Sequence, residues 1–343
     1  MLSKAENNEE AGSLKDLRKE CRIAVSGMEC TSSPLMAATK QDQANPAAAP
    51  PPIFISTTTI HSLITHESLI RHLQSTLRHL SASIQIQSPI RHAHQTSPNS
   101  SFLLMPSWST SLSLPYIGTK LVTHHSNNST LNLPGVHAIY VLFNSLTGQP
   151  LASIDATELT LYRTACVSAL ASIYLSREDS KTLVMIGAGS LAPHLIKAHL
   201  SVRPNIKQVV VYNRTIEKAI VLVNQLKNED IWLDGVCFES NGCLEEVVKM
   251  GDIISCATNS ETPLVKGVDL KKGAHLDLVG SFTPSMRECD DEAVRRGRVF
   301  VDNEAAVEAG EWRDLDEITV FKSVGSAVVD LLSAQMVYES FME

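Results

Sequence analysis

Residues 181–192 read KTLVMIGAGSLA, and this stretch decides the fold of the 343-residue chain. Residues 181–186 form a short apolar run of the kind found in central parallel strands. The run leads directly into a GxGxxA turn made by Gly187, Gly189 and Ala192. The first glycine permits a tight turn, the second lets backbone approach a pyrophosphate, and the alanine allows the next helix to pack closely. The stretch therefore predicts a Rossmann-type dinucleotide-binding unit.

Further apolar runs predict a doubly wound parallel sheet. Residues 208–212 (QVVVY) supply a second strand after one helix, and later runs predict strands at 252–256, 275–279 and 298–301. Ligands of such sheets lie at the carboxyl ends of the strands. The residues expected to bind a dinucleotide there are Gly187, Ala188, Gly189, Ser190, Leu191, Ala257, Thr258 and Val279, with Asn259, Gly280 and Ser281 beside them.

The residues after the second strand bear on the choice of cofactor. NAD-binding sites usually place Asp or Glu there, whereas this chain has Asn213, Arg214 and Thr215. Arg214 can pair with a 2′-phosphate, and Thr215 can bind phosphate and cap the helix that begins with Glu217. The alternative is that Arg214 is a solvated turn residue and Thr215 a simple cap. Because position and charge agree, we expect NADPH as the cofactor, with NADH as the alternative.

The preceding sequence predicts an α+β domain with an antiparallel sheet. Apolar residues at helical spacing predict a helix at 66–80, and residues 137–143 and 150–154 flank a loop ending in glycine, which indicates a hairpin. Residues 159–175 predict a long, mostly buried helix in which Arg163 is the single charged residue. Such a setting requires a paired anion or polar partner for Arg163.

Composition and the N-terminal stretch exclude several classes of protein. Hydrophobic residues make up 43% and charged residues 19%, and the net charge is -8, which predicts a soluble globular protein without nucleic-acid or membrane partners. Seven scattered cysteines lack CxxC spacing, and no ligand cluster indicates a metal. The Pro/Ala tract at 44–52 predicts disorder in residues 1–52. Acids near Met1 argue against a transit peptide that starts there, and Met36 is an alternative start.

Six segments of the chain resemble the ornithine cyclodeaminase/mu-crystallin family. They are RTACVS at 163–168, GAG at 187–189, NRT at 213–215, GAHLDLVG at 273–280, VDNE at 301–304 and TVFKS at 319–323. The resemblance spans residue 53 to the C-terminus. It implies that Arg91, Lys120 and Arg163 bind a substrate carboxylate, that Lys120 is a candidate proton donor, and that Arg163, Thr164 and Ser323 lie beside the cofactor. The alternative for each basic residue is a surface charge, which fits Arg91 better than Arg163.

The resemblance is fullest to a plant reductase of this family and implies a function. The expected reaction is NADPH-dependent reduction of a cyclic ketimine, piperideine-2-carboxylate (dehydropipecolate), to pipecolate, in lysine catabolism and plant systemic acquired resistance. The implied compartment is the plastid, with the cytoplasm as the alternative, and the implied assembly is a homodimer. Cyclodeaminases carry an Asp where this chain has Phe282 in VGSF (279–282), which favours reduction. An ornithine cyclodeaminase and a non-catalytic NADPH or small-ligand binding protein of crystallin type remain the alternatives.

A second departure from the family lies near the end of the chain. Relatives carry helix and loop between the segments matching 307–311 and 316–323, whereas four residues join them here. We therefore expect an extension at 1–52, a substrate and dimerisation domain at 53–158, and an NADP-binding domain at 159–326 that is shortened after residue 311. A helix at 327–343 is expected to return to the first domain through Val328, Leu331, Leu332, Gln335 and Met336.

Overall fold

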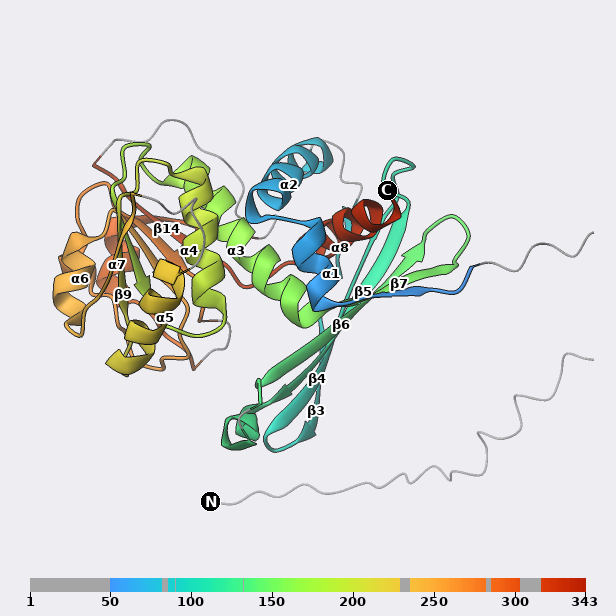
Figure 1. The fold of residues 1–343 in the computed structure, drawn as a ribbon, viewed down its shortest axis with the longest axis horizontal. Helices are drawn as coiled ribbons and strands as arrows, with labels where there is room; N and C mark the ends of the chain where they lie inside the picture. Colours follow the sequence, from blue (N-terminus) through green and yellow to red (C-terminus); the bar gives the residue numbers. More distant parts are fainter. Residues whose placement is uncertain are drawn as a thin grey trace, which may run out of the picture. The chain divides into compact units, whose positions relative to one another are not determined.

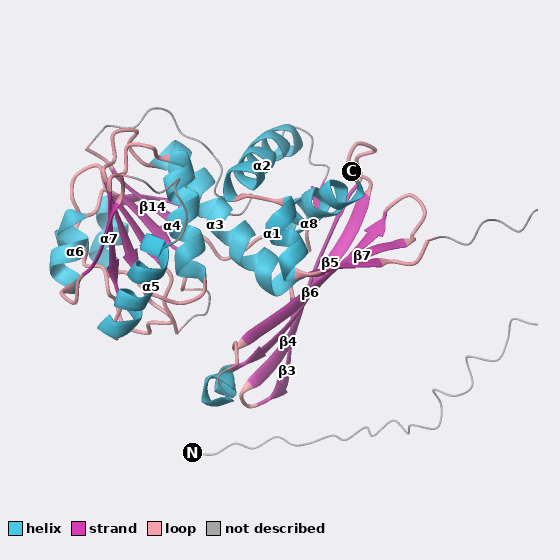
Figure 2. Cartoon of the chain, viewed as in Figure 1, coloured by secondary structure: helices cyan, strands magenta, loops and turns pink. Residues whose placement is uncertain are grey.

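A computed structural model describes residues 50–81, 86–89, 91–131, 133–228, 235–281, 285–302 and 316–343. Residues 49–343 form one compact unit that contains two β-sheets (Figures 1 and 2). The predicted disorder before residue 50, Phe282 and the shortened segment at 303–315 all lie outside the described residues.

The sheet whose central strand leads into the glycine turn is parallel in every described pair of strands. Its strand order is β10-β9-β8-β11-β12-β14-β13, so the order reverses beside β8, at the place where doubly wound sheets bind ligands. The strands are β8 (Thr182–Ile186), β9 (Gln208–Tyr212), β10 (Cys237–Ser240), β11 (Ile253–Cys256), β12 (His275–Leu278), β13 (Gly297–Val301) and β14 (Ile318–Lys322).

Alternate side chains of β8 enter two different apolar layers. Leu183 and Met185 pack with residues of α4 (Leu191–Val202) and α5 (Ile216–Asn228), whereas Val184 and Ile186 pack with residues of α6 (Leu244–Met250) and α7 (Asp291–Arg296). Successive residues of a strand point to opposite faces, so only a continuous apolar run can serve both layers. The predicted Rossmann-type sheet is thereby confirmed.

The second sheet is antiparallel except at one edge, where β1 (Ile53–Ile55) runs parallel to β7 (Pro150–Asp155). Its order is β1-β7-β6-β5-β4-β2, with β3 also paired to β4. The remaining strands are β2 (Ile86–Gln87), β3 (His92–Ser97), β4 (Ser100–Ser109), β5 (Tyr116–His125) and β6 (Val136–Asn144), and a 3-10 helix spans Ser126–Leu131. The predicted hairpin is β6 and β7, and the predicted antiparallel sheet is confirmed.

Helices α1 (Thr57–Leu63), α2 (His66–Ser81), α3 (Ala156–Leu175) and α8 (Ala327–Met342) accompany this second sheet. The Asp155 carboxylate caps α3 by accepting hydrogen bonds from the amides of Thr157 and Glu158. Helix α3 contacts β6 and β7 of this sheet as well as β12 and β14 of the parallel sheet. It therefore joins the two sheets directly.

The last helix, α8, packs against β4, β5 and β6, as Figure 1 shows. The prediction that one side of α8 faces the first domain was too narrow. Leu331, Leu332 and Gln335 are buried as expected, but so are Val329 and Ala334 on other sides of the helix. Val328 and Met336 are only partly buried. The helix is covered around most of its circumference because α1, α2 and α3 also contact it.

Candidate active site

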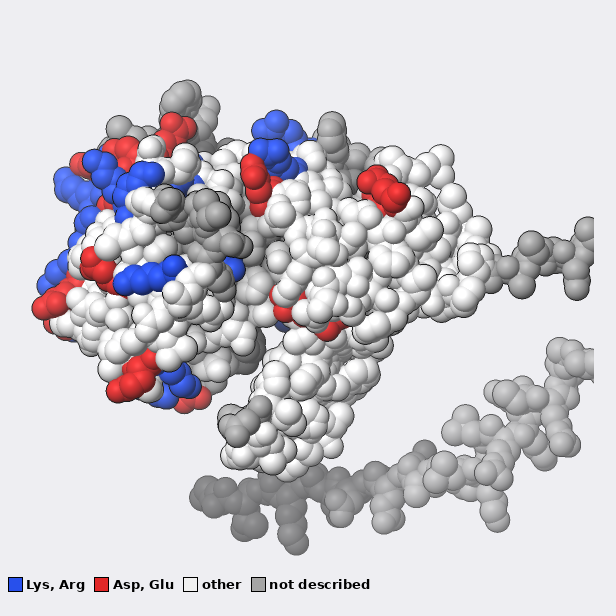
Figure 3. Space-filling model, in the orientation of Figure 1, with Lys and Arg blue, Asp and Glu red and all other residues white. Residues whose placement is uncertain are grey.

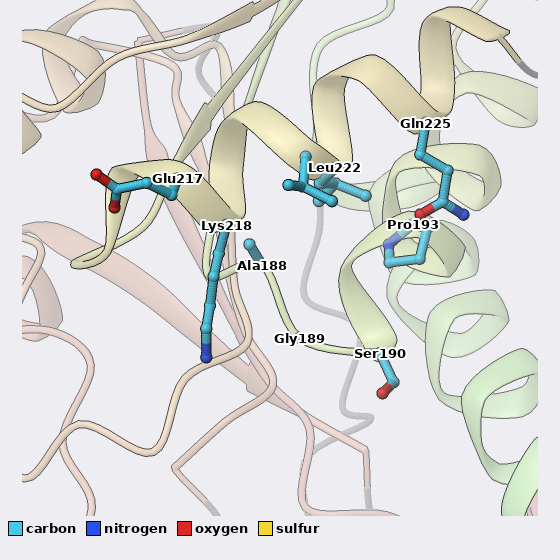
Figure 4. A pocket seen from close by; sticks show the side chains of 9 residues that line it. Ala188, Gly189, Ser190, Pro193, Glu217, Lys218, Leu222 and Gln225 are labelled. Atoms are coloured by element: carbon cyan, nitrogen blue, oxygen red, sulfur yellow. The ribbon is translucent and has the colours of Figure 1, made fainter. Parts of the chain in front are cut away.

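The glycine turn has the geometry that a dinucleotide requires. Gly187 has φ +113°, and a Cβ at this position would lie 2.5 Å from the carbonyl oxygen of Ala257, so only glycine fits. A Cβ on Gly189 would meet nothing within 4 Å, which leaves open space in front of the backbone. Beside the turn lies an open pocket of about 360 Å³ lined by Ala188, Gly189, Ser190, Pro193, Glu217, Lys218, Val221, Leu222 and Gln225 (Figure 4). This backbone can cradle a pyrophosphate at the start of α4.

The turn after β9 presents a positive charge beside the pocket. The Asn213 side-chain amide donates a hydrogen bond of 2.8 Å to the Thr215 carbonyl, which fixes the turn. Arg214 and Thr215 are exposed. Thr215 directly precedes α5, which begins at Ile216, and its backbone carbonyl accepts from the Lys218 amide, as the carbonyl of an N-cap residue does.

Lys218 is a residue that the sequence analysis missed. Its side chain extends from the first turn of α5 past Ala188, and it lines the same pocket as Gly189 and Ser190 (Figure 4). A lysine four residues after Arg214 lies about one helical turn from it. The four-residue spacing between Arg214 and Lys218 was the feature of the sequence from which Lys218 could have been predicted. The segment after β9 thus carries two cations, Arg214 in the turn and Lys218 in the first turn of α5.

The loops that follow β11 and β12 are fixed by a buried carboxylate. Glu288 is 1% exposed and accepts hydrogen bonds from the Thr258 amide (2.7 Å), the Thr258 hydroxyl (3.0 Å), and the amides of Gly280 (2.8 Å) and Ser281 (3.1 Å). Burial raises the pKa of Glu288, and these hydrogen bonds oppose the rise. The carboxylate therefore holds Thr258 and its neighbours Ala257 and Val279 at the carboxyl ends of their strands.

Ser323, at the carboxyl end of β14, belongs to a turn that connects the two halves of the site. Its hydroxyl donates to Asp302 Oδ2 at 2.8 Å, and the same carboxylate accepts from the amides of Val324 and Gly325. On the other side of the turn, Arg91 donates to the carbonyls of Val324 (2.9 Å) and Gly325 (3.2 Å). Arg91 remains exposed, so its guanidinium is anchored to this turn and also open to a ligand.

Lys120 and Arg163 converge on one carboxylate. Asp330 of α8 lies 2.9 Å (Oδ1) and 2.8 Å (Oδ2) from Lys120 Nζ of β5, and 2.9 Å (Oδ1) from Arg163 Nε of α3. The contact with Arg163 is an ion pair whose angle is not that of a hydrogen bond. All three residues are at most 7% exposed. The terminal nitrogens of Arg163 face Gly325, where a Cβ would lie 3.2 Å from Nη1.

Burial and charge together set the protonation of this cluster. Burial, and after it the positive charge of Arg163, lower the pKa of Lys120 to about 8 even though the Asp330 carboxylate opposes both effects. Burial acts to raise the pKa of Asp330, but Arg163 and then Lys120 outweigh it and hold that pKa below its usual range. The cluster therefore combines a carboxylate with a lysine whose proton is more easily given up than usual.

The structure brings the predicted residues into two connected groups. Lys120 and Arg163 meet at Asp330, and Arg91 joins them through the turn at 323–325. Thr164 is buried beside Arg163, and Leu191 begins α4. Asp330, Glu288 and Asp302 were not predicted. Asp330 could have been predicted as a buried acid, because it is the only charged residue in the apolar segment AVVDLLSAQ (327–335).

Other sites are not evident in the part of the chain that the structure describes. There, no three His, Cys, Asp or Glu side chains are arranged to hold a metal ion. The five described cysteines are free thiols. Helices long and apolar enough to cross a membrane were also not found within the described ranges.

Comparison with known proteins agrees with this geometry. SAR DEFICIENT 4 from Arabidopsis thaliana is 48% identical over 321 residues, which cover 85% of this chain and 98% of the relative. A Δ1-pyrroline-2-carboxylate reductase from Colwellia psychrerythraea is 36% identical over 84% of this chain and 99% of its own length.

Solved structures with the same fold include two that hold a nicotinamide dinucleotide. The Δ1-pyrroline-2-carboxylate reductase of Thermococcus litoralis, in complex with NADH and L-proline, superposes with a TM-score of 0.78 at 27% identity, over 84% of this chain and 97% of that one. An archaeal alanine dehydrogenase dimer with bound NAD superposes with a TM-score of 0.76 at 25% identity, over 85% and 96% of the two chains. The family model for ornithine cyclodeaminase/mu-crystallin matches residues 52–316. The chain therefore belongs to the ornithine cyclodeaminase/mu-crystallin family.

Proposed function

We propose that the protein is an NADPH-dependent reductase of cyclic imino acids that converts piperideine-2-carboxylate to pipecolate. The observation that carries the proposal is the buried cluster of Lys120, Arg163 and Asp330, joined by one turn to the carboxyl end of the dinucleotide-type sheet. The positive charges of Lys120, Arg163 and the neighbouring Arg91 outnumber the one negative charge of Asp330. The site therefore has excess positive charge and can accept a carboxylate. Relatives that are Δ1-pyrroline-2-carboxylate reductases support a cyclic imino acid as substrate.

The residues of the chain divide the work of such a reaction. Arg163 and Arg91 would bind the substrate carboxylate and thereby orient the C=N bond. Lys120 would donate a proton to the imine nitrogen, for which a pKa of about 8 is well suited near neutral pH. The reduced nicotinamide supplies the hydride when it is bound. The open backbone at Gly189 and the fixed loops at Thr258 and Gly280 fit such a dinucleotide.

The preference for NADPH rests on the turn after β9. It carries Arg214 and, one turn later, Lys218, and no acid stands in the position that would accept from a 2′-hydroxyl. We expect Arg214→Asp to reverse the preference from NADPH to NADH, because a charged hydrogen bond contributes about 1.5–3 kcal/mol. Equal dissociation constants for both dinucleotides in the unmutated protein would refute this assignment.

The function is tested by dinucleotide oxidation over a panel of cyclic imino acids. Turnover of piperideine-2-carboxylate or its five-membered homologue supports reduction. Formation of proline and ammonia from ornithine would instead support a cyclodeaminase. Binding of NADPH without turnover of any imine would support a crystallin-type binding protein.

We also propose a homodimer formed through the second sheet. Residues 86–155 contain only Arg91, Lys120 and Asp155 as charged residues, and Figure 3 shows a nearly uncharged surface over these strands. Ile117 and Val136 of this sheet are 38% and 40% exposed. An uncharged face with exposed aliphatic residues suits a self-complementary interface. Light scattering that gives a monomer at micromolar concentration would overturn this proposal.

A role in plant systemic acquired resistance and a plastid location are the further parts of the proposal. The first is supported by the plant relative SAR DEFICIENT 4, and the second rests on the family resemblance alone. Pipecolate levels in plants that lack the gene, and the position of a fluorescent fusion of the full chain, test the two parts separately. A cytoplasmic fusion would leave the reaction in place and overturn the compartment.

A further inference from the structure

Asp330 is a buried acid in the last helix of the chain. It is 2% exposed and lies between the cations of β5 and α3, 210 residues after Lys120. A buried carboxylate is costly unless cations pair with it, and the converse holds for the cations. Without Asp330, Lys120 and Arg163 would face each other as like charges in a buried site. The acid is therefore the group that allows both cations to lie together in one buried cluster.

The contact fixes the Lys120 ammonium but does not consume its hydrogens. Nζ lies across both carboxylate oxygens, at 2.9 Å and 2.8 Å, and the hydrogen bond goes to Oδ1. Among the described residues, Asp330 is the only hydrogen-bond partner of this ammonium group. An ammonium has three donors, so two stay free to be directed at a ligand. We propose that Asp330 is the positioning residue of the site, which keeps Lys120 protonated and aims it at the imine nitrogen.

This inference rests on the proposed reduction, and its proton count is simple. Hydride forms the new C–H bond at the imine carbon, and the π electrons of the C=N bond move to nitrogen. The nitrogen then takes a proton from the Lys120 ammonium and becomes an amine. Lys120 is left as a neutral amine beside the Asp330 carboxylate, which stays ionised throughout. Water returns the proton to Lys120 before the next turnover.

The charges around Lys120 determine the direction of each expected shift. Arg163 from α3 and Arg91 from the segment before β3 both lower the pKa of Lys120, and Asp330 from α8 raises it. The Tyr140 hydroxyl of β6 also lies near Asp330 and stays neutral, because burial raises its pKa. Loss of the Asp330 charge should therefore lower the pKa of Lys120 below about 8.

The test is Asp330→Asn, with Glu339→Gln on the same helix as the matched control. Lysine labelled with ¹³C at Cε, assigned with Lys120→Met, gives the pKa of Lys120 by NMR titration of the protein without any dinucleotide. We expect that pKa to fall by more than about one unit in Asp330→Asn and to stay unchanged in the control. We also expect kcat to fall about 100-fold while KM changes by less than about threefold, with the loss of rate at high pH starting at lower pH.

Several outcomes decide the inference. An unchanged Lys120 pKa in Asp330→Asn would overturn it, whatever the activity. If the wild-type protein reduces no imine, the proposed function fails, and the titration still tests the charge relation. If Asp330→Asn does not fold, Asp330→Glu keeps the charge but moves the carboxylate by one methylene. If Asp330→Glu has a Lys120 pKa close to that of the wild type but a lowered kcat, the positioning role of Asp330 is supported. If Asp330→Glu has the kcat of the wild type, the positioning role is contradicted.

Discussion

Arg163→Met should lower the rate of imine reduction and raise the pKa of Lys120. The substitution removes a guanidinium that is 7% exposed but keeps an unbranched apolar chain in α3. Loss of one charged hydrogen bond to a substrate carboxylate costs about 1.5–3 kcal/mol, which corresponds to roughly a 10- to 150-fold decrease in kcat/KM. This decrease is expected mainly in KM, because the carboxylate is bound in both ground and transition states.

The pH dependence of kcat/KM shows in which direction the pKa of Lys120 moves in Arg163→Met. Arg163 lowers the pKa of Lys120, which is about 8 in the intact cluster. Removing the guanidinium takes away one of the two positive charges that oppose Asp330, so the pKa of Lys120 rises and Lys120 keeps its proton to higher pH. The fall of kcat/KM at alkaline pH should then begin above pH 8, opposite to the shift expected for Asp330→Asn.

The assay is dinucleotide absorbance during imine reduction from pH 6 to about pH 10, since this range brackets the pKa of about 8. Arg71→Met, which removes an exposed cation paired with Glu67 on α2, is the control and should change neither rate nor profile. A lower alkaline pKa in Arg163→Met, or the same decrease in kcat/KM in both variants, would refute the reasoning.

Three further predictions concern the turn, the fold and the shortened segment. Gly187→Ala should abolish dinucleotide binding and lower Tm, because its Cβ would lie 2.5 Å from the Ala257 carbonyl oxygen; an unchanged Tm contradicts this. His66 is stacked on Tyr162, and burial lowers its pKa to about 3. In the unfolded chain the same histidine has a pKa of about 6.5. As pH falls below about 6.5, His66 therefore binds a proton in the unfolded chain but not in the folded protein, and the folded protein loses stability. Urea unfolding should show the wild type losing about 2 kcal/mol more stability between pH 6.5 and 5 than His66→Phe, and equal slopes would contradict it. A family-like insert between residues 311 and 316 should raise both Tm and turnover, and no change in either would show that it is dispensable.

Much of the parallel sheet could be predicted because its strands are continuous apolar runs. The predicted strand at 208–212 is β9 itself, and those at 252–256 and 275–279 exceed β11 and β12 by one residue each. β4 and β5 were not predicted, since serine, threonine and lysine interrupt their apolar residues. β10 and β14 were also missed. β10 (CFES) holds only two apolar residues and β14 (ITVFK) includes Thr319 and Lys322, so neither is a continuous apolar run.

The parts of the site made of contiguous residues could be predicted from the sequence, whereas contacts between residues far apart in the sequence could not. The turn at Gly187 and the cations at 213–215 could be predicted because their chemistry lies in contiguous residues. Arg163 was expected to need an anion, and the structure shows that the anion is Asp330. Nothing in the sequence connects positions so far apart. Only the packing of α8 against β5 and α3 brings them together.

The place of Asp330 near the end of the chain has a consequence for biosynthesis. A ribosome adds about 5–20 residues per second, so the 210 residues between Lys120 and Asp330 take roughly 10–40 s to make. During that interval the nascent second sheet lacks the helix that covers β4, β5 and β6, and its two cations lack their counter-ion. The cluster is therefore complete only after residue 330 has been made, and a transcript that ends before codon 330 yields a polypeptide in which Lys120 and Arg163 lack their anion.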